Sequence, residues 1–95
     1  MVKVLVKMIL KENQINDLKT LVPELVAETR KESGCIQYQL IQDRDNNNIF
    51  FFVEEWDSPS SLEKHMNSPH FHRAMPRLEK IQAVPMEINV CNLFI

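Results

Sequence analysis

The chain has 95 residues, of which 44% are hydrophobic and 25% are charged, and its formal net charge is −2. That length predicts one domain with a modest core, and the composition argues against a disordered chain. Lysine and arginine never cluster, which excludes a basic nucleic-acid surface, and no apolar run approaches the ~20 residues that span a bilayer.

The N-terminal segment does not have the pattern of a secretory signal. Its apolar stretch contains Lys3 and Lys7, and no small-residue cleavage site follows it. Two cysteines, Cys35 and Cys91, in a chain without an export signal indicate reduced thiols. We therefore expect a soluble cytoplasmic domain that spans residues 1–95 and binds neither nucleic acid nor membranes.

The first half of the chain predicts a strand followed by a long helix. Residues 2–10 alternate with a period of two, which is typical of a strand. From Ile15 to Val26 apolar residues recur every three or four positions, as in an amphipathic helix. We expect Asn13 to cap this helix, Pro23 to kink it, and Gly34 to end it in a left-handed conformation.

The second half predicts a hairpin, two short helices and a last strand. Cys35–Gln42 and Ile49–Trp56 have strand composition and are separated by a turn rich in Asp and Asn. Ser58-Pro59 and Ser68-Pro69 each have the signature of a helix start. Pro76 is expected to kink or end the second of these helices, and the final strand begins near Met86.

The resulting order, β-α-β-β-α-β, predicts an α+β chain with a ferredoxin-like antiparallel sheet of strand order 4-1-3-2. Cys35 and Cys91 then lie on opposite edge strands and cannot form a disulfide within one chain. The strands carry apolar residues at both parities, so both faces of the sheet require cover. We therefore expect a homodimer in which two sheets face each other.

Three consecutive segments, RKESGCIQYQL, FFVEEW and DSPSSLEKHMNSPHF, together resemble the antibiotic biosynthesis monooxygenase family. The shared pattern is a glycine after a helix, a tyrosine-bearing strand, a Glu-x-Trp strand end, and a His before a Ser-Pro helix start. The resemblance implies a dimeric α/β barrel and cofactor-independent oxygenation of quinols, anthrones and similar aromatics by O2. Relatives on the same scaffold degrade haem or isomerise small metabolites, so the resemblance does not fix the reaction.

Four residues are candidates for the catalytic site. His65 matches the family histidine and is expected to act as general base, with Glu54 orienting its ring. Tyr38 and Trp56 are expected to donate hydrogen bonds to a substrate oxygen. Each has a structural alternative: a histidine bonded at a helix end, a hairpin ion pair, a packed tyrosine and a core tryptophan.

Phe52, Met66 and Phe71 are expected to line the substrate pocket, although core packing would equally explain the two phenylalanines. We expect no metal site, because His65, His70 and His72 lack the spacing of paired ligands on one continuous helix. No cofactor is expected. Two other functions stay open: an isomerase that moves a proton with the same residues, and a small-molecule-binding dimer without catalysis.

Overall fold

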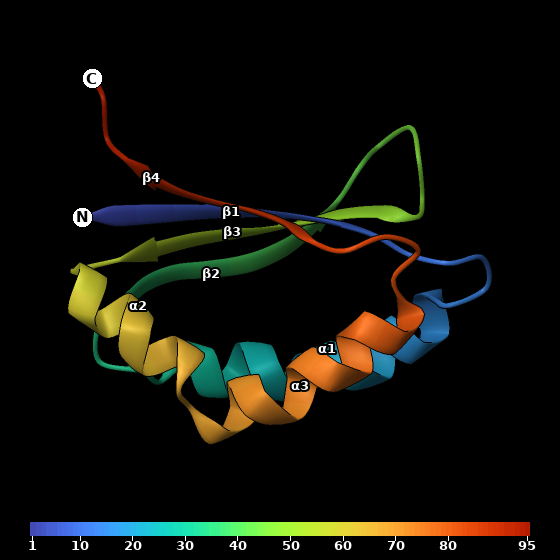
Figure 1. Ribbon diagram of the computed structural model, residues 1–95, viewed down its shortest axis with the longest axis horizontal. Helices are drawn as coiled ribbons and strands as arrows, with labels where there is room; N and C mark the ends of the chain where they lie inside the picture. The colour runs from blue at the N-terminus through green and yellow to red at the C-terminus, as the bar shows by residue number, and fades with distance from the viewer.

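The computed structural model describes residues 1–95 and has two layers, a four-stranded antiparallel sheet and three helices that all cover one of its faces (Figure 1). In chain order the elements are β1 (Val2–Ile9), α1 (Ile15–Arg30), β2 (Cys35–Gln42), β3 (Ile49–Trp56), α2 (Pro59–Met66), α3 (Pro69–Ile81) and β4 (Glu87–Asn92). No helix combines the length and the apolar composition that crossing a membrane requires.

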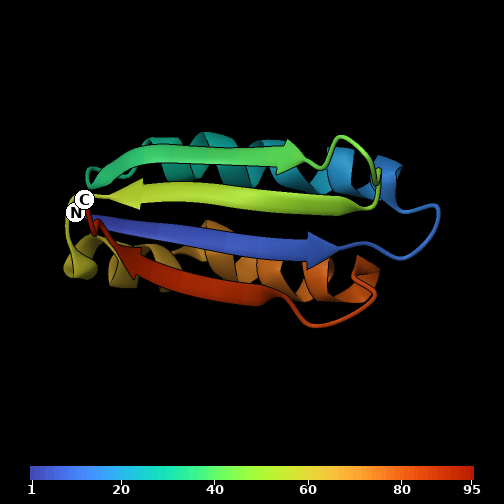
Figure 2. The same ribbon diagram turned by 90° about the horizontal axis from the view of Figure 1, so that it is seen from above.

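The strands lie in the order β2-β3-β1-β4, which confirms the predicted ferredoxin-like topology (Figure 2). Cys35 on β2 and Cys91 on β4 are therefore on opposite edges of the sheet, and both are free thiols, as expected. Along β3 buried and half-buried residues alternate, because successive side chains point to opposite faces of a strand. Trp56, at the end of β3, is completely buried.

The short helices begin where the two Ser-Pro pairs predict. Ser58 and Ser68 accept hydrogen bonds at their side-chain oxygens from the backbone N–H groups of Ser61 and Phe71, and a proline follows each serine. These caps fix where α2 and α3 start, and so place the end of α2 beside the beginning of α3. Pro76 does not end α3, which continues to Ile81.

Two predictions about the first helix are wrong. Asn13 is not the N-cap: Gln14 holds that position without a side-chain cap, while Asn13 itself has a left-handed φ of 64°. Gly34 has no positive φ, and the helix already ends at Arg30. Glycine is needed there because a β-carbon would overlap the Ser61 side chain. Close packing, not backbone handedness, is the physical reason for this glycine.

The sheet face opposite the helices is uncovered (Figure 1). Part of it is apolar: Leu5 pairs with Val53 across β1 and β3, and Phe51 pairs with the aliphatic but charged side chain of Lys7. Leu5 is 46% exposed, while Phe51 and Val53 are half-buried. Lys3 and Glu55 form an ion pair of 3.7 Å near one end of this face. A partly apolar face of this kind is a surface that another protein layer can cover. It is consistent with the expected homodimer, which stays a prediction.

Candidate functional site

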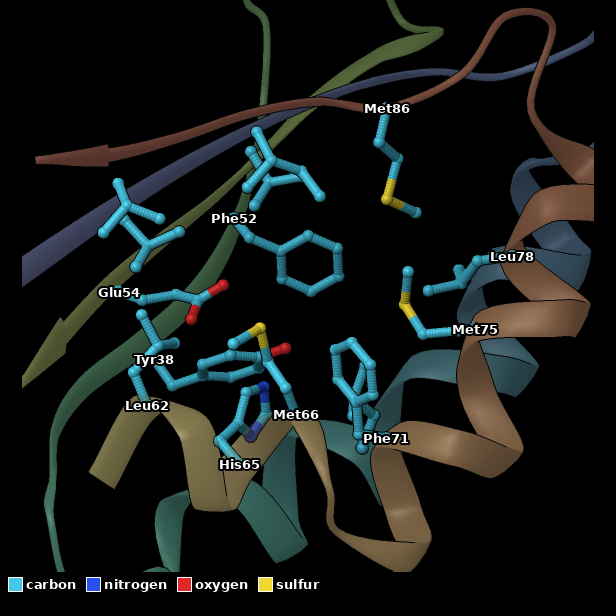
Figure 3. A pocket seen from close by; sticks show the side chains of 15 residues that line it. Tyr38, Phe52, Glu54, Leu62, His65, Met66, Phe71, Met75, Leu78 and Met86 are labelled. Atoms are coloured by element: carbon cyan, nitrogen blue, oxygen red, sulfur yellow. The ribbon is translucent and has the colours of Figure 1, made fainter. Parts of the chain in front are cut away.

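A cavity of about 70 Å³ lies between the inner face of the sheet and helices α2 and α3 (Figure 3). Fifteen residues line it, and thirteen of them are hydrophobic; the two exceptions are Glu54 and His65. On the β4 side the lining residues Ile88 and Val90 are 57% and 61% exposed, so the cavity opens toward that edge. The site is thus an apolar hollow with one carboxyl group and one imidazole.

The structure brings six of the seven predicted site residues to this cavity. They come from β2, β3, α2 and α3: Tyr38, Phe52, Glu54, His65, Met66 and Phe71. They meet because inner-face positions of neighbouring strands are paired, Tyr38 with Glu54 and Leu40 with Phe52. Trp56 does not line the cavity; its indole packs against the ring of His65, with centroids 4.7 Å apart.

Glu54 is buried and has one hydrogen bond, which the indole Nε1–H of Trp56 donates to Oε1 over 3.0 Å. Burial raises the pKa of Glu54 to about 7; the bond from Trp56 acts in the opposite direction, and the charge of Glu32 adds to the rise. The partners predicted for Glu54 were His65 or a backbone amide; the structure gives it the indole of Trp56 instead, and Glu54 and His65 share no hydrogen bond. The indole N–H already donates its hydrogen bond to Glu54, so it is not available to donate one to a substrate.

His65, on the last turn of α2, is 2% exposed and has aromatic rings around it. Ring centroids of Tyr38 and Phe71 lie 5.4 and 5.2 Å from that of the imidazole. Burial lowers the pKa of His65, while the hydrogen bond and the charge of Glu32 oppose the decrease. Such a histidine is neutral at pH 7 and can accept a proton.

The partner of the imidazole is Glu32, which the sequence did not single out. Its Oε2 lies 2.7 Å from Nδ1 of His65 and 2.8 Å from Nε2 of His70. Because a carboxylate oxygen accepts, each imidazole contributes an N–H to it. The Nδ1–H tautomer leaves the other nitrogen of His65, Nε2, with a lone pair and no hydrogen bond to the protein.

Tyr38 extends from β2 into the cavity (Figure 3). Burial, and then the nearby carboxyl of Glu54, raise the pKa of its hydroxyl far above its ordinary value. The phenol therefore stays protonated and can donate a hydrogen bond. The cavity thus contains a neutral imidazole with a free lone pair, a carboxyl group that holds its proton up to about neutral pH, and a phenol donor. This combination suits proton transfer within a dry aromatic environment.

Known proteins are similar to this chain in sequence and fold. The family model described as "Antibiotic biosynthesis monooxygenase" matches residues 1–77. A crystal structure of an antibiotic biosynthesis monooxygenase superposes with a TM-score of 0.93 at 30% identity, covering 98% of both chains. A conserved protein from Methanosarcina mazei Go1 gives a TM-score of 0.92 at 33% identity, covering 95% of this chain and 89% of that one.

A curated relative, protein sll1783 of Synechocystis sp., is 34% identical over 62 residues, which are 65% of this chain and 42% of that protein. The chain therefore aligns with less than half of that relative's length. The family model, in contrast, covers most of this chain, and the matched structures agree with it in both fold and sequence. The chain belongs to the antibiotic biosynthesis monooxygenase family.

Proposed function

We propose that this protein is a monooxygenase that oxidises a small electron-rich aromatic, quinol-like or anthrone-like, with O2 and without a cofactor. The observation that supports it most directly is the composition of the cavity, in which an imidazole and a carboxyl group are the only non-hydrophobic lining residues. A polar substrate would require more polar partners, whereas an aromatic ring with one or two hydroxyl groups requires few.

The chemistry begins with a proton transfer. Ground-state O2 is a triplet, so it reacts slowly with closed-shell molecules, but a phenolate is electron-rich enough to supply the first electron itself. Nε2 of His65 is the base that removes the hydroxyl proton, and Glu32 holds the ring and stabilises the imidazolium that forms. For a hydroquinone, one oxygen atom of O2 then enters the ring to give a hydroxyquinone, and the other leaves as water.

We assign to Glu54 the second proton transfer, in which a proton is given to the reduced oxygen. Its pKa of about 7 means that much of it is a neutral acid at neutral pH, and it lines the same cavity as His65. We assign Tyr38 a hydrogen bond to the substrate oxyanion. Trp56 keeps an indirect role: its N–H positions the carboxyl of Glu54.

The size of the cavity limits the substrate. A cavity of about 150 Å³ accommodates benzene in a well-packed protein, so the 70 Å³ hollow must widen to admit even one ring. Three methionines line it, Met66, Met75 and Met86, and unbranched thioether side chains change rotamer readily. Substrate entry therefore requires these side chains to move aside near the open β4 edge.

Oxygen uptake with a panel of hydroquinones, in buffer stripped of metals, tests the proposal. We expect His65→Ala to lower kcat by roughly 10²–10⁴-fold, the usual contribution of a general base. His72→Ala is the matched control, because His72 is exposed and does not line the cavity. With ¹⁸O2, one labelled atom should appear in the product. An unchanged rate in His65→Ala would remove the imidazole from the mechanism.

The small cavity also favours one alternative, an isomerase for a non-aromatic oxygenated metabolite. An imidazole that accepts a proton and a carboxyl that donates one are sufficient to move a proton between two carbons. The same experiment separates the two reactions, because an isomerase consumes no oxygen with any hydroquinone and exchanges substrate protons with deuterated water.

A further inference from the structure

Glu32, His65 and His70 place three metal-ligating atoms together on the outer side of the cavity wall. Oε2 of Glu32, Nδ1 of His65 and Nε2 of His70 all lie within 4.8 Å of one another. We propose that these three residues bind a divalent transition metal of borderline hardness, such as Zn²⁺ or Co²⁺. Two imidazoles and one carboxylate are a common ligand set for these ions, with a further position open to water.

The two distances from Glu32 are close to those between ligands of a coordinated ion. Zinc bonds nitrogen and oxygen at about 2.0–2.2 Å, which puts neighbouring tetrahedral ligands about 3.3 Å apart. Glu32 is now 2.7 and 2.8 Å from the two ring nitrogens, so it must recede by about half an ångström. Glu32 follows the end of α1 and precedes β2, outside any helix or strand, so this movement disturbs no regular element.

An ion can reach this position from solvent without entering the cavity. The side chains of Glu32 and His70 are 17% and 12% exposed, whereas His65 is 2% exposed. The two accessible ligands form an outer edge and the buried imidazole forms the floor. The prediction of no metal site rested on the spacing of His65, His70 and His72 and on the helix break between them; the third ligand here is a carboxylate 33 positions before His65.

A metal at Nδ1 would change what His65 presents to the cavity. The imidazole proton, now donated from Nδ1 to Glu32, would move to Nε2, so the cavity would face an N–H in place of a lone pair. The metal would therefore inhibit a reaction in which His65 is the base. Only this consequence depends on the proposed function; the binding site itself does not.

Trp56 is the only tryptophan in the chain, and its ring lies 4.7 Å from that of His65, which makes it a direct reporter. The test titrates the intact protein with Co²⁺ and follows tryptophan fluorescence, then displaces Co²⁺ with Zn²⁺. Co²⁺ should quench the fluorescence of Trp56 in the wild type. In His70→Gln, which removes one ligand, the affinity for Co²⁺ should be weaker by roughly 10–100-fold. His72→Gln is the matched control and should bind as the wild type does.

The thiols require a separate control, because Cys35 and Cys91 are free and also bind these metals. Co²⁺ should quench Trp56 with unchanged affinity in a Cys35→Ser, Cys91→Ser double variant. Equal affinity in wild type and His70→Gln, or loss of binding in the double variant, would overturn the proposal. If Co²⁺ binds as expected but the metal-free wild type consumes no oxygen with hydroquinones, the metal site stands and the proposed function fails.

Discussion

Oε2 of Glu32 accepts a hydrogen bond from Nδ1 of His65 over 2.7 Å, joining residues 33 positions apart. The contact crosses from the segment after α1 to the last turn of α2. It holds the imidazole in the tautomer whose Nε2 lone pair is free towards the cavity. In the proposed reaction this carboxylate would therefore act through the histidine and not on the substrate.

Replacing Glu32 by Gln should lower kcat for hydroquinone oxidation by about 10–100-fold and leave KM unchanged, because the amide no longer stabilises the imidazolium but occupies the same volume. Steady-state oxygen uptake in the presence of a chelator measures both constants. His72→Gln is the control, since His72 is exposed and does not line the cavity. A matching rise in KM would indicate that Glu32 only shapes the pocket.

The pKa of Glu54 predicts how stability depends on pH. In the folded protein this carboxyl ionises near pH 7, and in the unfolded chain near its ordinary 4.5. Between those values the unfolded state has released the proton and the folded state has not, so rising pH favours unfolding. At pH 8 the ionised, buried carboxylate lowers the free energy of unfolding by about 2–3 kcal/mol relative to pH 4.

Glu54→Gln isolates this effect, because the amide oxygen can still accept the bond from Trp56 but has no charge. Between pH 4 and pH 8 the free energy of unfolding of the variant should rise by about 2–3 kcal/mol relative to that of the wild type. Urea unfolding followed through Trp56 fluorescence measures both. His65 has a lowered pKa, which acts in the opposite direction in both proteins and cancels in the comparison. A constant difference across this range would show that Glu54 ionises normally.

The sequence predicted the elements more accurately than the connections between them. Strands Cys35–Gln42 and Ile49–Trp56 have their predicted bounds, because alternating apolar residues and a polar turn are local signals. Both Ser-Pro helix starts are confirmed for the same reason. Gly34 was misread, since the constraint on it comes from Ser61, which is distant in sequence.

The candidate site shows the same division. Strand parity predicts that Tyr38, Phe52 and Glu54 share the inner face, and the structure places all three in the cavity wall. Glu32 was missed because it lies in a short polar segment with no periodicity, and its role depends on how α1 and α2 pack. No local pattern identifies such a contact.

Met66 should control which aromatics enter. It lines the cavity but is 44% exposed, so truncating it enlarges the hollow at little cost in stability. We expect Met66→Ala to lower KM for a two-ring quinol by roughly tenfold while changing KM for a one-ring quinol far less. Ile36→Ala is the control, being 53% exposed and outside the cavity lining. Equal changes for both substrates would show that the ring enters elsewhere.

The uncovered sheet face predicts self-association. Leu5 pairs with Val53 on that face and is 46% exposed, so a second copy packed sheet to sheet would bury both. Leu5→Lys places a charge in that contact and should raise the dissociation constant by at least about 100-fold, or about 3 kcal/mol. Size-exclusion chromatography with light scattering measures the mass at several concentrations.

Val84→Lys is the control for the added charge, because Val84 is 50% exposed but lies in the loop between α3 and β4. It should leave the dimer intact, and circular dichroism should show that both variants stay folded. A wild-type chain that stays monomeric at high micromolar concentration would contradict the prediction.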